Sequence, residues 1–143
     1  MFYWDASAIL ALFIFEKATN MIRSFSANTE ALPSYTTIIT PLEVESAIQR
    51  RIKERSITLE QAEEVRSLAS DFRKEIYLVF ADQNVLDIAL HLQKIYGLRV
   101  GDAIQLASAR AGTEDPSTIY FLCLDEKLNE AAKLECFKVP FLG

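Results

Sequence analysis

One acidic residue stands at the start of an otherwise apolar and small stretch. The stretch 100–109 reads VGDAIQLASA, and its single carboxylate is Asp102. In a helix, Asp102 shares a face with Leu106 and Ala109, so the acid is expected to lean toward the core. A lone buried carboxylate is costly unless a cation or hydrogen-bond donors meet it. One explanation is capping, since Asp102 followed by Gln105 fits an N-cap with its capping-box partner. The other explanation is a functional site.

Three further acids lie just after predicted strands. Asp5 and Asp125 each directly follow a predicted apolar strand. Glu43 lies one helical turn beyond the end of a third predicted strand. Parallel strands end at one edge of a sheet, so these acids are expected to project there, within reach of Asp102. Each also has a structural explanation: Asp5 and Asp125 as N-caps, and Glu43 as the partner of Thr40 in a capping box.

Four carboxylates in one cleft would repel one another and raise each other's pKa values. A hard divalent cation resolves that conflict, and ligands that are all oxygen select Mg²⁺ or Mn²⁺ over zinc or copper. No cluster of His or Cys in the sequence offers a competing site. A magnesium site of this kind leaves positions open for water and phosphate oxygens, so the pattern indicates phosphoryl chemistry.

The elements that must position these acids alternate between strands and helices. Strands are predicted at 2–4, 34–39, 76–80, 118–124 and 137–139, and helices at 8–13, 18–27, 40–52, 58–69, 82–96, 100–109 and 126–134. Several strands are apolar throughout, as in sheets that are covered on both faces. We therefore expect an α/β fold, with a central parallel sheet flanked by helices on both faces, as a single domain over 1–143.

Composition narrows the class of protein further. Half of the residues are hydrophobic and only four are glycine, which favours a compact fold over disorder. The net charge of −5 argues against a protein that coats nucleic acid by bulk electrostatics. A nucleic acid would have to bind through a local basic patch or through bound cations. The longest apolar run, 8–15, is too short to span a membrane. Two cysteines without ligand spacing favour reduced thiols and a cytoplasmic location.

Four motifs resemble those of the PIN-domain ribonucleases, in the same order along the chain. They are YWDASAI at 3–9, EVESAIQRR at 43–51, LRVGDAIQLASA at 98–109 and LDEKLNEAA at 124–132. The third motif is the most specific of the set. The resemblance covers essentially the whole chain, whose compact size is similar to that of the VapC-type toxins of toxin–antitoxin pairs.

The resemblance implies Mg²⁺- or Mn²⁺-dependent cleavage of single-stranded RNA or RNA loops, leaving a 5′-phosphate. Asp5 and Asp102 would be the principal metal ligands. Glu43 and Asp125 would complete the acidic cluster and help to orient the attacking water. Ser7 would support these acids or contact the substrate. The resemblance also implies a cognate antitoxin as partner, a homodimer and no association with membranes.

Two positions depart from the family pattern. Gln105 stands where a His is frequent, and Cys136 stands where a Gly often precedes the last strand. Neither is expected to touch the four acids. Glu45 is an alternative to Glu43 as the acid that faces the cleft. The two residues are separated by about 200° around a helix, so only one of them can face it. The residues that follow favour Glu43.

The only dense basic run has two interpretations. It consists of Arg50, Arg51, Lys53 and Arg55. It could be a solvated helix end whose cations complement the helix dipole. Alternatively, Arg50 and Arg51 contact the RNA backbone, since Arg50 shares a face with Glu43, or such arginines receive the acidic or hydrophobic tail of an antitoxin.

The remaining candidates are expected to be structural. His91, the only histidine, is predicted to be structural or on the surface. The aromatic residues are predicted to fill the core rather than stack on bases: Trp4 and the phenylalanines at 13, 15, 72, 80, 121 and 137. The apolar helices near the N-terminus could also supply a dimer or antitoxin surface.

Two other classes of function compete with the ribonuclease. A Mg²⁺-dependent phosphatase could use Asp5 as its nucleophile, but such enzymes carry a second acid two residues later, where this chain has Ser7. A non-catalytic PIN-like module could retain the fold to bind RNA or a partner. The intact set of four acids weighs against that module, because clustered carboxylates are costly to keep.

Overall fold

The centre of the fold is a four-stranded parallel sheet in the order β3-β2-β1-β4. The computed structural model describes residues 1–28 and 32–142. Its strands are β1 (Phe2–Trp4), β2 (Ser34–Thr37), β3 (Tyr77–Val79) and β4 (Tyr120–Leu122). Its α-helices are α1 (Ala6–Phe13), α2 (Thr19–Asn28), α3 (Thr40–Lys53), α4 (Leu59–Lys74), α5 (Gln83–Tyr96), α6 (Val100–Ala111) and α7 (Glu126–Leu134). The predicted α/β class with a parallel sheet is confirmed.

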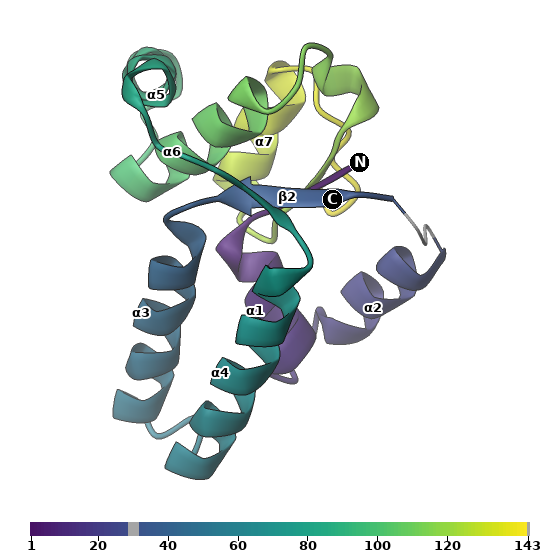
Figure 1. The fold of residues 1–143 in the computed structure, drawn as a ribbon, viewed down its shortest axis with the longest axis vertical. Coiled ribbons are helices and arrows are strands. Elements are labelled where there is room, and N and C mark those ends of the chain that lie inside the picture. Colours follow the sequence, from purple (N-terminus) through teal and green to yellow (C-terminus); the bar gives the residue numbers. More distant parts are fainter. Residues whose placement is uncertain (29–31, 143) are drawn as a thin grey trace.

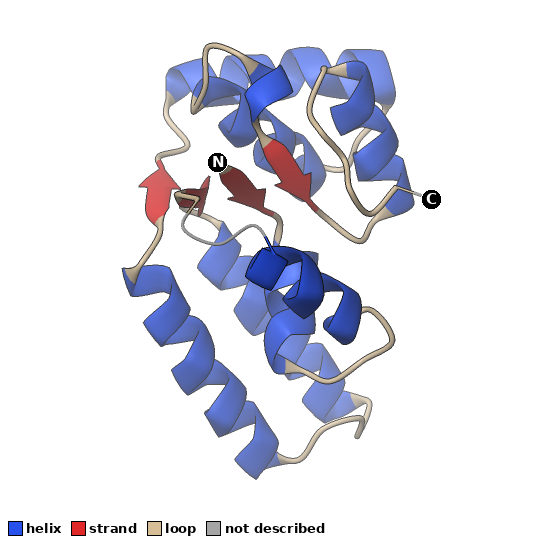
Figure 2. Ribbon diagram, turned by 90° about the vertical axis from the view of Figure 1, so that its right-hand side faces the viewer, coloured by secondary structure: helices blue, strands red, loops and turns tan. Residues whose placement is uncertain are grey.

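Helices cover both faces of this sheet. In Figure 1, α5, α6 and α7 lie above β2, while α1, α2, α3 and α4 lie below it, and Figure 2 shows the strands enclosed between the same two layers. Alternate side chains of β1 enter opposite layers, as a strand requires. Tyr3 packs in the core beneath α5–α7, whereas Phe2 and Trp4 pack in the core against α1–α4. The sheet therefore separates two hydrophobic cores.

Residues close in sequence fix several helix ends. Thr58 and Gln61 form a reciprocal capping box at the start of α4, with N–H···O distances of 3.1 and 2.8 Å. Asp82 caps α5 through the backbone N–H of Val85. Gly97 ends α5 in the left-handed conformation, at φ 65°, which glycine adopts without steric cost. The helix predicted at 82–96 agrees with α5, whereas the one predicted at 58–69 begins where α4 does but ends five residues before it, at 69 rather than Lys74.

The strands are shorter than predicted. The residues of 34–39 that follow Thr37 form the turn into α3, with Ile39 as its N-cap. At the other end of the sheet, Thr118 belongs to a short 3-10 turn, Pro116–Thr118, before β4. The predicted last strand at 137–139 is only one parallel bridge, between Tyr120 and Lys138. Apolar and β-branched runs thus extend beyond the paired residues.

Two phenylalanines predicted for the core lie at the surface. Phe15 is 77% exposed in the connection after α1, and Phe80 is 71% exposed after β3, which is an edge strand with a neighbour on one side only. Trp4, Phe121 and Phe137 are buried as predicted. The other two, at 13 and 72, are half-buried against the core of α1–α4. His91 is exposed, which agrees with its prediction.

The length of the helices and the state of the two cysteines bear on two further predictions from the sequence. Over residues 1–28 and 32–142, none of the helices has the length and apolar character needed to cross a membrane. Cys123 is buried and Cys136 is exposed, and both are free thiols. Cys136 adopts φ 73°, a left-handed conformation that favours glycine.

Candidate active site at the carboxyl edge of the sheet

A cleft of about 610 Å³ opens where the strands end and the helices begin. The four acids predicted from the sequence all line it, together with Ser7 and Arg50. Arg99 and Gly101 line it as well. The acids come from the first turn of α3, the first turn of α6 and the residues that cap α1 and α7. The helices therefore aim four N-termini, with their partial positive charge, at one group of carboxylates.

Asp5 is both a helix cap and a member of this cleft. Its Oδ2 accepts hydrogen bonds from the backbone N–H and the hydroxyl of Ser7, at 3.1 and 2.5 Å. Asp5 is buried, with 6% of its surface exposed. Burial raises the pKa of Asp5, the two Ser7 bonds lower it, and the charge of Asp102 raises it again. The capping explanation for Asp5 is thus confirmed, but it does not exclude a place in the cleft.

Glu43 is not part of a capping box. Thr40, predicted as the N-cap of α3, is its first residue, and its buried hydroxyl bonds with Thr36 Oγ1 (2.7 Å) and Gln105 Nε2 (3.0 Å). The carboxylate of Glu43 instead accepts a hydrogen bond from Gln105 Nε2. Burial raises the pKa of Glu43, the Gln105 bond lowers it, and the nearby charges of Asp5 and Asp102 raise it.

Gln105 therefore contacts one of the four acids, and the expectation that it would not was wrong. Its side chain is fully buried, and its Oε1 accepts from the hydroxyl of Tyr3 at 2.5 Å. Because Tyr3 engages the carbonyl end, the amide nitrogen is directed toward Glu43 and Thr40. A buried amide on an apolar helix must find partners, and that is the signal in the sequence that could have indicated this role.

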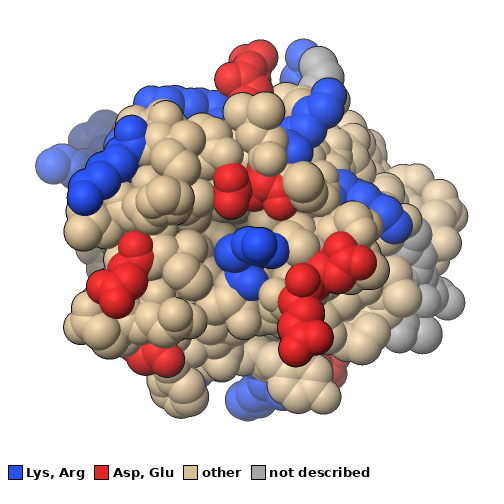
Figure 3. Space-filling view, turned by 90° about the horizontal axis from the view of Figure 1, so that it is seen from above, with Lys and Arg blue, Asp and Glu red and all other residues tan. Residues whose placement is uncertain are grey.

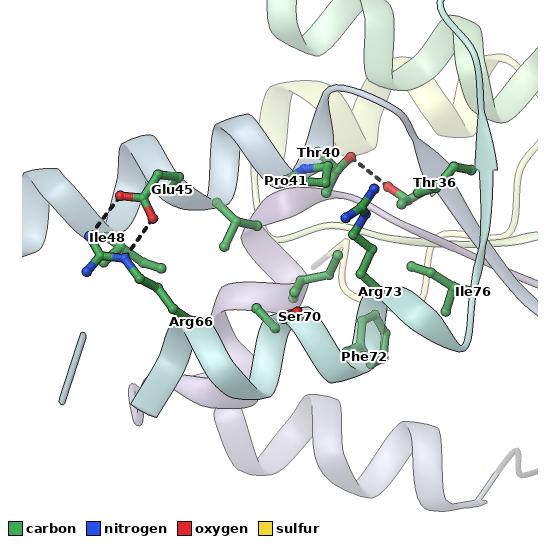
Figure 4. Close-up of a pocket in the computed structure, with 14 residues that line it drawn as sticks. Thr36, Thr40, Pro41, Glu45, Ile48, Arg66, Ser70, Phe72, Arg73 and Ile76 are labelled. Atoms are coloured by element: carbon green, nitrogen blue, oxygen red, sulfur yellow. Dashed lines mark hydrogen bonds and ion pairs between the residues drawn. The ribbon is translucent and has the colours of Figure 1, made fainter. Parts of the chain in front are cut away.

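Glu45 lies on the other side of α3 and does not reach the cleft. Its carboxylate pairs with Arg66 at 2.8 Å and accepts from Gln49. It borders a separate pocket of about 290 Å³ between α3 and α4, shown in Figure 4, where Glu45 and Arg66 face each other across the two helices. The helical spacing correctly placed Glu43, rather than Glu45, toward the acids.

Asp102 does not cap its helix. The N-cap of α6 is Arg99, and Asp102 lies within the first turn with its side chain 18% exposed. The capping interpretation of Asp102 and Gln105 is therefore wrong. Gly101 allows α6 to approach α3 closely, because a Cβ atom there would lie 2.7 Å from Oε2 of Glu43. The motif thus brings Asp102 and Glu43 side by side.

Asp125 caps α7 and shares a cation with Asp102. Its Oδ1 accepts from the backbone N–H of Leu128 at 2.8 Å, as the capping prediction states. Its Oδ2 lies 3.9 Å from the guanidinium of Arg99, which also lies 3.2 Å from Oδ2 of Asp102. The sequence reasoning missed Arg99, although its spacing of three residues from Asp102 suits an ion pair on a helix.

A buried thiol connects two sides of the cleft beneath the acids. Cys123 Sγ accepts from the backbone N–H of Asp125 at 3.3 Å and lies 3.8 Å from Oγ of Ser7, whose hydroxyl proton goes to Asp5. Ser7 in turn accepts from the backbone N–H of Leu124 at 3.0 Å. Burial raises the pKa of the Cys123 thiol, so the thiol stays protonated. Sequence reasoning assigned Cys123 no role here.

The structure separates the two arginines that were predicted to contact RNA. Arg50 lines the cleft, and its side chain makes no hydrogen bond or ion pair with the described residues. Arg51 instead forms an ion pair with Glu16 at 3.0 Å, away from the acids. On the face seen in Figure 3, basic and acidic side chains are interspersed without a continuous basic band. At the cleft itself, the basic residues that line it are Arg50 and Arg99.

The donor set fits a hard divalent cation in its chemistry. All four acids offer carboxylate oxygens, the ligands that Mg²⁺ and Mn²⁺ prefer. Burial raises the pKa values of Asp5 and Glu43, a cost that a cation bound beside them would offset. Within 1–28 and 32–142, no three Asp, Glu, His or Cys side chains are already grouped as a metal-binding set. Three of the acids are engaged by Ser7, Gln105 and Arg99.

Comparison with known proteins agrees with this arrangement. The family model of the PIN domain matches residues 2–134, which is nearly the whole chain and includes all four acids. No curated protein matches the chain in sequence. PIN domains are generally nuclease modules, and a cleft of carboxylates at the carboxyl edge of a parallel sheet suits the hydrolysis of nucleic acids. The chain belongs to the PIN-domain family.

Proposed function

We propose that this protein is an endoribonuclease that depends on Mg²⁺ or Mn²⁺ and uses Asp5, Glu43, Asp102 and Asp125. The observation that carries the proposal is the convergence of these acids, from four separate helix starts, on one cleft. Two of them, Asp5 and Glu43, have pKa values that burial raises. Perturbed carboxyl groups in a cleft are typical of functional sites.

Asp5 and Asp102 are proposed to hold the metal ion, with Glu43 and Asp125 completing the set directly or through water. When bound, such an ion lowers the pKa of a coordinated water and neutralises charge on the phosphate. Ser7 fixes Asp5 through its two hydrogen bonds. Gln105 fixes Glu43 through a hydrogen bond, and the role proposed for Glu43 is to help orient the attacking water.

Positive charge at the cleft is proposed to bind the substrate. Arg50 reaches it from α3 and is free to contact a phosphate of the RNA. The N-termini of α1, α3, α6 and α7 surround the same space, and helix N-termini favour anions. Both features stabilise a phosphodiester beside carboxylates that would otherwise repel it.

Asp5 is poorly placed to act as a phosphatase nucleophile. Its residue is 6% exposed, and its Oδ2 already accepts two hydrogen bonds from Ser7. The residue two positions later is a hydroxyl donor rather than a second acid. The geometry therefore supports metal-assisted attack by water over the covalent route.

We further propose that the protein is a VapC-type toxin with an antitoxin partner, a homodimer and a cytoplasmic location. The four motifs support this assignment through their resemblance. A helix with exposed apolar side chains supports an interface: Leu86 and Leu90, one turn apart on α5, are 44% and 52% exposed. This surface differs from the one predicted on the helices near the N-terminus, the first of which, α1, has five of its eight residues buried.

The test of the nuclease is cleavage of labelled structured RNAs with Mg²⁺, Mn²⁺ or EDTA. Wild type is compared with Asp102→Asn and with Glu45→Gln, which changes an acid of α3 that faces away from the cleft. We expect metal-dependent cutting by wild type and Glu45→Gln, and none by Asp102→Asn. Equal cutting by all three proteins would indicate a contaminating ribonuclease and contradict the assignment of Asp102.

Metal binding is tested separately from cleavage. A cation that binds only the folded protein raises its melting temperature, and at 100 times the Kd the gain is about 2.7 kcal/mol. We expect this shift in wild type and a smaller one in Asp102→Asn. A shift without cutting of any RNA would indicate a metal-loaded binding module, and growth arrest on expression, absent with Asp102→Asn, would support the toxin.

A further inference from the structure

Arg99 is the one cation that directly pairs with the acids of the cleft among the described residues. It is the N-cap of α6, yet its side chain makes no capping hydrogen bond. The side chain is 81% exposed, so the guanidinium is not needed to fill the core. Its partners are the carboxylates of the cleft: Asp102, in the first turn of α6, and Asp125, which caps α7.

These contacts are weak enough to exchange. Nε and one terminal nitrogen of Arg99 lie 3.3 and 3.2 Å from the same oxygen, Oδ2 of Asp102, rather than forming a fork with both oxygens. The contact with Asp125 is longer, at 3.9 Å. Ion pairs of long, solvent-exposed side chains contribute little to stability. A cation that binds Asp102 more strongly would displace the guanidinium.

We propose that Arg99 is an exchangeable counter-ion: it neutralises Asp102 and Asp125 in the metal-free cleft, and binds a phosphate oxygen of the nucleic acid once a divalent cation takes over those carboxylates. This inference rests on the proposed metal-dependent function. The planar guanidinium presents a fork of donors that suits phosphate oxygens. Its exposure leaves it free to turn from the acids to a substrate in the same cleft.

The exchange predicts opposite effects on the two ligands. Arg99 competes with the metal for Asp102, so its removal should tighten metal binding. The same removal should weaken RNA binding, but only when metal is present, because otherwise Asp102 retains the side chain. If Arg99 had a purely structural role, its removal would weaken the binding of both metal and RNA, or of neither. Arg50, which pairs with no described residue, should instead contribute to RNA binding in both conditions.

The experiment uses the full chain as wild type, Arg99→Ala, Arg99→Lys and Arg110→Ala. Arg110 is an exposed arginine at the other end of α6 and serves as the matched control. Mg²⁺ and Mn²⁺ alone are titrated by calorimetry. An RNA oligonucleotide is then titrated by fluorescence anisotropy at several salt concentrations, in EDTA and in Mg²⁺, and is checked afterwards for intact length.

We expect Arg99→Ala to bind metal about two- to fivefold more tightly than wild type, the range set by an exposed ion pair. In Mg²⁺, the salt dependence of RNA binding should fall by about one counter-ion in this variant, whereas in EDTA it should match wild type. Arg99→Lys should lie between the two proteins, and Arg110→Ala should match wild type throughout.

Two results overturn the inference, and they differ in what else they affect. Unchanged or weaker metal binding in Arg99→Ala, beside normal binding in wild type, rejects the exchange and leaves the metal-dependent nuclease standing. No metal binding by wild type, with Asp102→Asn indistinguishable from it, rejects the exchange and the proposed function together.

Discussion

The side-chain amide of Gln105 donates a hydrogen bond to the carboxylate of Glu43, 62 positions earlier in the chain. This bond joins α6 to α3 at the cleft, in a buried chain of polar groups that also includes Tyr3 and Thr40. Glu43 is thus held by the core rather than by its own helix.

Replacing Gln105 by leucine should lower both stability and activity. The hydroxyl of Tyr3 and the carboxylate of Glu43 would each lose a buried partner. An unsatisfied buried group costs about 1–3 kcal/mol. Urea unfolding measures the loss, and Gln49→Leu, which removes an exposed amide bonded to Glu45, is the control. Equal stability of Gln105→Leu and wild type would show that the buried network contributes nothing.

Gly101→Ala should reduce cleavage more than it reduces stability. A Cβ atom at Gly101 would lie 2.7 Å from Oε2 of Glu43, so the carboxylate would have to move while its flexible side chain absorbs the change. The comparison is Gly97→Ala, where nothing lies within 4 Å but φ is 65°. That variant should lose about 1 kcal/mol of stability through backbone strain and keep its activity. Cleavage rates and thermal melts of both variants check this; full activity in Gly101→Ala would contradict the close approach.

Asp5 should make the metal-free fold less stable as pH rises. Burial raises the pKa of Asp5 above its ordinary value of 3.8, so the folded protein binds the proton more tightly than the unfolded chain does. Stability from this group is present below the ordinary pKa and is lost as pH rises toward the folded pKa. Asp5→Asn keeps a capping side chain without the charge, and its stability should depend less on pH and exceed that of wild type at pH 7.

Urea midpoints from pH 4 to 8, measured in EDTA, check this prediction. Glu114→Gln, which removes an exposed acid in a loop, controls for the general effect of net charge. Parallel pH profiles for wild type and Asp5→Asn would mean that burial of Asp5 carries no electrostatic cost.

Arg50 and Arg51 should differ in RNA binding although they are adjacent in sequence. Arg50→Ala should weaken binding and lower its salt dependence by about one counter-ion, because its side chain lines the cleft. Arg51→Ala should leave that slope unchanged, since Arg51 pairs with Glu16 instead. Anisotropy titrations over a range of salt measure both slopes, and an equal fall in the two would indicate a diffuse basic surface.

The sequence by itself determined most of the elements and the edge of the sheet at which the four acids gather. Helical period and turn residues are local signals. The helix starts near 58 and 82, the helix end before Gly97 and the alternation of strands and helices could therefore be predicted without tertiary structure. The parallel topology follows from that alternation and brings the strand ends together. The acids at positions 5, 43, 102 and 125 could therefore be assigned to one cleft.

Only the tertiary structure decided which groups hold those acids. Gln105 and Glu43 meet because two helices pack across the sheet, and Gly101 leaves the space for that approach. The same packing turned Thr40 inward to Gln105, so the predicted capping box did not form. Arg99 and Cys123 gained their contacts in this way as well. Such partners depend on long-range packing rather than on spacing along the chain, because a buried polar group takes the donor that the fold brings to it.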